Sequence, residues 1–319
     1  MRLAAILVAA GILPAAADVP AFRFPVACTL GEDCFLQNLV DRDPGPGRAD
    51  LTCGPASYDG HKGIDIRLAT EAEIARGVAV LAAAPGTVRA LRDGMEDRPA
   101  RGPDGLAGRE CGNGVVIDHG DGWTTQYCHL RRGSVAVRTG QRVAAGQPIG
   151  QIGLSGMTEF PHLHLTLRHR GTVIDPLDGR PMSAPCGGGL APMIPLPAGW
   201  LPGPEIMLAG IAAAIPDAAD LRAGPAAGVG GRDAPAMVLW VQAINLSAGD
   251  RIVLRMRDPD GRELFADDHA MPRDRAVQMR AVGRRRPAGG WQPGRHEGVI
   301  ELRRGDRLID SARVAVVVE

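Results

Sequence analysis

Short apolar stretches alternate with turn-forming residues along most of the chain. Valine, isoleucine and leucine recur at alternate positions or in brief runs over 63–68, 78–83, 86–91, 115–119, 123–129 and 162–167. Similar stretches return at 237–241, 251–257, 277–281, 296–302 and 308–318. Brief runs of this kind, bounded by Gly, Pro and Asp, are typical of strands. The pattern predicts an all-β protein of two domains, the second a small immunoglobulin-like β-sandwich.

Turn signals indicate how the strands of the first domain are joined. Ala84-Pro85-Gly86-Thr87 and Gly120-Asp121-Gly122 each separate two predicted strands and favour hairpins. The segment 93–111 is polar, rich in Gly and Pro, and too long for a turn. We therefore expect a surface loop there, beside the functional site.

Composition divides the chain into five predicted segments. They are a signal peptide at 1–17, an arm at 18–57, a first β domain at 58–186, a Gly/Ala/Pro-rich linker at 187–233 and the sandwich at 234–319. Arg2 precedes an apolar run that ends in small residues, which fits a secretory signal cleaved before Asp18. This run is about half as long as a membrane span requires. We expect a periplasmic or secreted protein with no integral membrane segment after signal removal.

The six cysteines favour disulfides, because export places the chain in an oxidising compartment. Fifteen pairings are possible from the sequence alone. Cys28 is close to Cys34, and Cys111 and Cys128 bracket a predicted hairpin. We expect these two pairs, which leaves Cys53 for Cys186 and makes 18–57 a disulfide-stapled arm.

The balance of charge excludes one class of function. The chain has 36 basic (Lys and Arg) and 36 acidic residues, and basic residues cluster only at Arg284-Arg285-Arg286. A nucleic-acid-binding protein needs a basic face, so we expect no nucleic-acid partner.

The candidate chemistry lies in three short clusters of the first domain. His162 and His164 are one residue apart in a predicted strand, whose two-residue period points both rings to the same face. His61 and Asp65 share a face for the same reason, and Gly63 between them allows a close approach of the backbone. His129 ends a third predicted strand.

These five side chains fit a hydrolytic zinc site. Catalytic zinc has three protein ligands and keeps a fourth position for water, and His61, Asp65 and His164 supply such a set. Other divalent ions suit the same ligands. His129 and His162 would then exchange protons with the reacting groups, since an ordinary histidine pKa lies near 6.5.

The motifs around these residues resemble the LytM/lysostaphin-type zinc metallopeptidases. The matching stretches are His-Lys-Gly-Ile-Asp at 61–65, the segments 112–130 and 137–153, and Ser-Gly-Met-Thr-Glu-Phe-Pro-His-Leu-His at 155–164. The resemblance implies a compact antiparallel β fold, Zn²⁺ on His61, Asp65 and His164, and catalytic roles for His129 and His162. It also implies a zinc endopeptidase that hydrolyses peptide cross-links of bacterial peptidoglycan. The chain departs from the family at Cys128 and at Glu159-Phe160, beside the active groups.

The first domain has two alternative functions besides hydrolysis. A non-catalytic relative would bind and activate another cell-wall hydrolase, so a cell-wall protein partner is an alternative. The stretch 137–153 also resembles biotinyl and lipoyl domains, but that chemistry needs an exposed lysine and Lys62 is the chain's only one.

Several residues outside the five have structural interpretations. We expect Tyr58 to pack and not to bind the oxyanion, and His119 to end a hairpin. The histidines at 169, 269 and 296 are expected at the surface. The second domain has no residue group that indicates catalysis, so we expect an accessory role.

Overall fold

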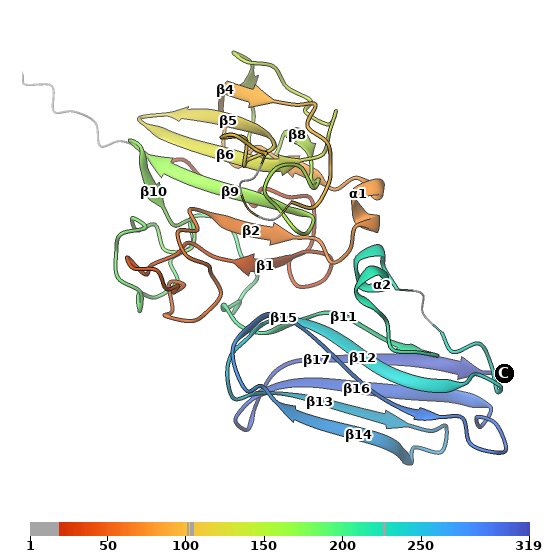
Figure 1. Ribbon diagram of the computed structural model, residues 1–319. Helices are drawn as coiled ribbons and strands as arrows, with labels where there is room; N and C mark the ends of the chain where they lie inside the picture. Colours follow the sequence, from red (N-terminus) through yellow and green to blue (C-terminus); the bar gives the residue numbers. More distant parts are fainter. Residues whose placement is uncertain (1–18, 101, 103–104, 226–227) are drawn as a thin grey trace, which may run out of the picture.

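The computed structural model describes residues 19–100, 102, 105–225 and 228–319. The predicted signal peptide at 1–17 lies outside these residues. Figure 1 shows two β bodies, an earlier one in red to green and a C-terminal one in cyan to blue. Nearly all regular structure in the described residues is β, as predicted. Helices α1 (Ala72–Arg76) and α2 (Ala218–Ala223) are short, and no helix among the described residues could cross a membrane.

One antiparallel sheet forms most of the first body. Its strands are β1 (Phe35–Asn38), β2 (Ile64–Arg67), β4 (Gly86–Arg92), β5 (Asn113–Gly120), β6 (Trp123–Leu130), β7 (Arg142–Val143), β9 (His162–His169) and β10 (Thr172–Ile174). Their order is β1-β2-β9-β6-β5-β4-β7, and β10 pairs with β9. The strands β3 (Ala79–Leu81) and β8 (Pro148–Gln151) form a separate pair. The predicted hairpin of β5 and β6 is confirmed. The hairpin predicted at 84–87 is wrong, because β3 pairs with β8 while β4 pairs with β5 and β7 in the large sheet.

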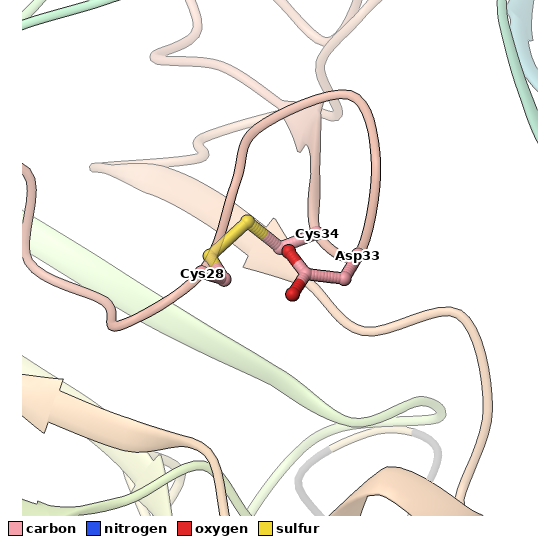
Figure 2. A group of neighbouring side chains, drawn as sticks. All are labelled: Cys28, Asp33 and Cys34. Carbon is pink, nitrogen blue, oxygen red and sulfur yellow. A yellow bond between two sulfur atoms is a disulfide. The ribbon is translucent and has the colours of Figure 1, made fainter.

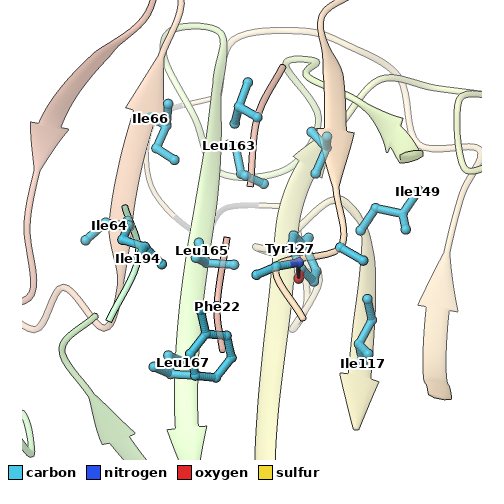
Figure 3. Packing of buried hydrophobic residues seen from close by; sticks show 14 of the residues in the cluster. Phe22, Ile64, Ile66, Ile117, Tyr127, Ile149, Leu163, Leu165, Leu167 and Ile194 are labelled. Carbon is cyan, nitrogen blue, oxygen red and sulfur yellow. Dashed lines mark hydrogen bonds between the residues drawn. The ribbon is translucent and has the colours of Figure 1, made fainter. Parts of the chain in front are cut away.

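The two faces of this sheet have opposite character. One face is packed into the hydrophobic core by side chains that include Ile64, Ile66, Tyr127, Leu163, Leu165 and Leu167 (Figure 3). Because side chains alternate along a strand, the residues between these leucines of β9 lie on the other face. That face therefore carries His162 and His164, and the core holds their strand in place.

The second body is a sandwich of two antiparallel sheets. Its strands are β11 (Glu205–Ala212), β12 (Ala236–Leu246), β13 (Asp250–Arg257), β14 (Glu263–Ala270), β15 (Arg275–Arg285), β16 (Gly294–Arg304) and β17 (Arg307–Val318). One sheet has the order β11-β12-β15 and the other β14-β13-β16-β17, and apolar residues of both share a core. The immunoglobulin-like class of this sandwich stays a prediction.

Two strands lie where the sequence indicates only connections. β1 belongs to the segment 18–57, and it pairs with β2 through a short, interrupted register. β11 belongs to the segment 187–233, and it pairs along its length with β12. Both strands owe their conformation to a partner strand, which local pattern does not reveal. The predicted domain boundaries stay predictions, but 205–212 extends a sheet of the sandwich.

The bodies meet at the β1 edge of the first sheet. Phe35 of β1 and Ala69 pack with Met207 and Ile244 of the second body in a small apolar cluster. Next to this cluster, the Asn245 side-chain amide donates a hydrogen bond of 3.2 Å to the carbonyl of Leu36. The second body thus covers an edge strand that would otherwise present unpaired backbone groups.

Three disulfides confirm the expected pairing: Cys28–Cys34, Cys53–Cys186 and Cys111–Cys128. Figure 2 shows the first, with the Asp33 carboxylate beside it. These three side chains are close enough to suggest a metal site. Because both sulfurs are in the disulfide, neither is a thiolate, so the group lacks the ligands that a metal needs.

Candidate metal centre

His61, Asp65 and His164 converge on one point of the polar sheet face. Asp65 of β2 and His164 of β9 are register partners in the antiparallel pair, and His61 precedes β2. The Asp65 Oδ1 atom lies 3.1 Å from His61 Nε2 and 2.8 Å from His164 Nδ1. The two histidine nitrogens are 3.0 Å apart. Three donor atoms this close together can all ligate one ion.

The backbone at Gly63 makes this convergence possible. A Cβ atom at Gly63 would lie 2.3 Å from the Leu165 carbonyl oxygen and 2.9 Å from the His164 ring. Any side chain would therefore push β9, and with it His164, away from β2. The close approach that the sequence predicts at this glycine is confirmed.

Each ligand is oriented by a second hydrogen bond. His61 Nδ1 lies 2.7 Å from the Leu39 carbonyl, which can only accept a hydrogen bond, so Nδ1 holds the proton. The lone pair of Nε2 can then ligate a metal. Asp65 Oδ2 accepts a bond of 2.7 Å from the Asn38 side chain. His164 Nε2 lies 3.0 Å from Thr166 Oγ1. The roles of Asn38 and Leu39 were not predicted. The sequence signal at these positions is weak: a side-chain amide at Asn38 within a short apolar run.

The charges suit a divalent cation. Burial alone would raise the pKa of Asp65, but His61 and His162 hold it well below its usual range, so the group is a carboxylate. Burial also opposes the charged form of His61, yet Asp65 outweighs it and raises the His61 pKa. Burial lowers the pKa of His164 despite the same carboxylate. One carboxylate and two imidazoles are a donor set that zinc accepts.

His129 and His162 lie beside the three donors. Their ring centroids are 4.6 Å apart, and His162 Nε2 is 3.4 Å from Asp65 Oδ1. His129 Nδ1 lies 2.8 Å from the carbonyl of Ser155, and His162 Nδ1 lies 2.9 Å from that of Phe160. Both Nδ1 atoms therefore hold protons, which leaves each Nε2 as a base. The structure thus brings all five predicted side chains together.

The backbone of His129 has a left-handed conformation, with φ of 63°. Few residues other than glycine adopt this conformation, and such strain is often found at functional sites. Its backbone N–H bonds the carbonyl of Cys111, and its own carbonyl accepts from Gly153, so the conformation is held from both sides. Burial, together with His162 and His164, keeps the His129 pKa well below its ordinary value. The ring is therefore neutral at neutral pH.

Residues 59–176 match the model of peptidase family M23, and this range includes all five side chains. The chain contains an M23 peptidase domain. This confirms the resemblance to LytM-type peptidases. Asn38 and Leu39, which orient two of the candidate ligands, precede the matched range.

Three curated proteins are similar to parts of this chain. The murein hydrolase activator NlpD of Escherichia coli is 34% identical over 136 residues, which are 43% of this chain and 30% of that protein. The peptidoglycan DD-endopeptidase ShyA of Vibrio cholerae is 44% identical over 64 residues, 20% of this chain and 14% of that protein. The cell division protein DipM of Caulobacter vibrioides is 41% identical over 64 residues, which are 20% of this chain and 10% of that protein. The matches span a third or less of these relatives.

Solved structures similar to part of this chain include a zinc-containing peptidase from Vibrio cholerae. It is 26% identical, with a TM-score of 0.29, and the match covers 44% of this chain and 39% of the chain of that structure. The catalytic domain of EnpA from Enterococcus faecalis is 23% identical, with a TM-score of 0.32, and the match covers 46% of this chain and 90% of the EnpA chain.

Two aromatic rings border the centre of the M23 domain. Tyr58 lies over His61 with ring centroids 4.4 Å apart and is 45% exposed. The Phe160 ring centroid lies 4.6 Å from that of His162 and 4.4 Å from the guanidinium carbon of Arg67. Burial lowers the Arg67 pKa to about 10, opposed by Glu73 and Asp65, so Arg67 stays charged near the centre.

The other histidines lie outside the centre of the M23 domain. His119 bonds the Pro85 carbonyl and the Thr125 hydroxyl at the end of the β5–β6 hairpin, as expected. His169 is half-buried and stacks on Trp123. The expectation for His296 is wrong, because its side chain is 1% exposed, and neither ring nitrogen has a partner among the described residues. Strand β16 turns that residue into the sandwich, where the pattern predicted a surface position.

Proposed function

We propose that the chain is an exported zinc endopeptidase that hydrolyses peptide cross-links of bacterial peptidoglycan in the periplasm or outside the cell. The observation that carries this proposal is the convergence of His61, Asp65 and His164, with His129 and His162 in contact beside them. A zinc ion held by the three donors would supply a water of lowered pKa and polarise the scissile carbonyl.

The two remaining histidines would move the protons. Nε2 of His129 or His162 accepts the proton that the attacking water loses, and it returns that proton to the leaving amine. The carbonyls of Ser155 and Phe160 fix the rings in the tautomer with a basic Nε2. Burial keeps the His129 ring neutral and so ready to accept a proton. We propose cross-links of the diaminopimelate type as the substrate.

The alternative function is activation of another cell-wall hydrolase. It is supported by the likeness to NlpD, a murein hydrolase activator, over 136 residues. Such a protein would bind a partner hydrolase and need no complete metal set. The presence of all five histidine and aspartate positions favours the enzyme.

Release of muropeptides from purified sacculi tests this choice. The zinc-loaded chain should convert cross-linked dimers into monomers, and chelation or His162→Ala should abolish the conversion. His269→Ala, in strand β14 of the second body, is the matched control and should remain active. A chain that binds one equivalent of zinc but cuts no sacculi, while accelerating a second hydrolase, would support the activator instead.

A further inference from the structure

A shallow groove lies on the polar sheet face beside the metal centre. It has a volume of about 160 Å³, and its floor and walls include Ala90 and Arg92 of β4, Gly114 and Val116 of β5, and Gln126 of β6. Gln126 is the register partner of Thr166, two residues beyond His164 on β9. One strand across and two residues along correspond to about 8 Å between backbones. The groove is thus within reach of a peptide whose scissile bond lies at the centre.

Arg168 extends the polar groups of this groove along β9. It shares the face of His164, because the two positions are an even number of residues apart. Its guanidinium is half-buried and donates a bond of 3.2 Å to Gln126 Oε1. No described carboxylate forms an ion pair with it. Arg168 is therefore a partly desolvated cation whose hydrogen-bond partner among the described residues is a neutral amide.

This contact determines what Gln126 presents to the groove. A guanidinium can only donate, so the amide must turn its oxygen to Arg168 and its NH₂ group elsewhere. No described residue accepts from that NH₂ group. Arg92, at the opposite wall, adds another cation, which donates to the Gly112 carbonyl, and the described residues that line the groove include no acidic one. The polar side chains of the groove thus offer donors and positive charge.

We propose that Arg168 and Gln126 form a subsite for a carboxylate of the substrate peptide, a few residues from the scissile bond. A carboxylate accepts from the guanidinium and the amide together, which matches their donor geometry. Peptidoglycan stem peptides are acidic, so this inference rests on the proposed function and specifies its substrate as a peptide with a free carboxylate. A peptide whose carboxylates are amidated would leave the Arg168 charge unpaired.

Two cross-linked peptides that differ only in a free carboxylate or its carboxamide test the subsite. For the zinc-loaded chain, kcat/KM should be higher for the carboxylate peptide. Arg168→Gln should reduce kcat/KM for that peptide by roughly ten- to a hundredfold, the range for a charged hydrogen bond. The same variant should hydrolyse the carboxamide peptide like the parent, which shows that it is folded. Gln126→Glu should also lose activity only towards the carboxylate peptide, because the new carboxylate would pair with Arg168 and repel the carboxylate of the substrate.

Arg138→Gln removes the same charge from an exposed loop and should change neither rate. Equal rates for the two peptides, or a loss in Arg168→Gln that is the same for both, would overturn the subsite. Calorimetric titration of each peptide into the His162→Ala chain separates this question from catalysis. Carboxylate-selective binding that depends on Arg168, without any hydrolysis by the parent, would uphold the subsite and refute the proposed enzyme.

Discussion

Asn38 donates a 2.7 Å hydrogen bond to the oxygen of Asp65 that faces away from His61 and His164. The bond leaves Oδ1 for the ion and fixes the plane of the carboxylate. Asn38 lies on β1, the edge strand that the second body covers through Asn245. The orientation of a candidate metal ligand thus depends on a strand outside the range that matches the peptidase family.

We expect Asn38→Ala to weaken zinc binding by about ten- to a hundredfold, because groups that orient a ligand typically contribute this much. A competition titration with a chromophoric chelator measures the affinity. Gln292→Ala removes an exposed amide of the second body and serves as the control. Unchanged affinity in Asn38→Ala would mean that the core alone orients Asp65.

Gly63→Ala should damage the site through sterics. The added methyl group would overlap the Leu165 carbonyl, so β2 and β9 must separate, and overpacking of this kind costs about 1–3 kcal/mol. We expect lower thermal stability and weaker zinc binding together. Gly203→Ala, where a Cβ meets nothing within 4 Å, should leave both unchanged. A variant that loses stability but retains zinc affinity would contradict the steric link to His164.

The sequence is sufficient to group the five candidate side chains, because each lies in or next to a strand with clear alternation. His162 and His164 alternate with core leucines, so their shared face follows from the period of a strand. Asn38 could not be identified in the same way, because β1 is a strand only through its register with β2. Gln126 and Arg168 were missed for a related reason: they meet across two strands, and neither belongs to a recognisable motif. His296 was predicted at the surface because alternation along a strand separates its two faces but does not show which face is packed into the sandwich.

The contact between the two bodies should make their unfolding cooperative. Ile244 is fully buried against Phe35 and Met207, and truncation of such a residue typically costs about 2–5 kcal/mol. We expect Ile244→Ala to lower the stability of both bodies in urea unfolding followed by tryptophan fluorescence. Val277→Ala, at the register partner of Ile244 but partly exposed, should have a small effect. Destabilisation of the second body alone would show that the first does not depend on this contact.

Glu205 should make stability depend on pH. Burial raises its pKa to about 7, with the bond from Trp200 opposing and Asp310 adding to the shift. The unfolded chain loses this proton near pH 4.5, and the folded chain keeps it until about pH 7. Folding therefore binds a proton in this window, so the free energy of unfolding falls as pH rises across it.

Glu205→Gln stays neutral and retains an oxygen to accept from Trp200. Its melting temperature should exceed that of the parent above pH 7, and the difference should shrink towards pH 4.5. Comparing parent and variant at each pH cancels the titration of the histidines. A difference that is constant with pH would show that the Glu205 carboxyl is ionised in the folded chain.

The disulfides should differ in their contribution to stability in the order of the loops that they close. Cys53 and Cys186 are 133 residues apart, whereas Cys28 and Cys34 are 6 apart. Chain entropy gives about 5 kcal/mol for the longer loop and about 2 kcal/mol for the shorter. Replacing both cysteines of each pair by alanine, with unfolding followed in urea, should reproduce this order. The reverse order would indicate that Cys28–Cys34 acts through native packing around buried Cys34 and not through the unfolded chain.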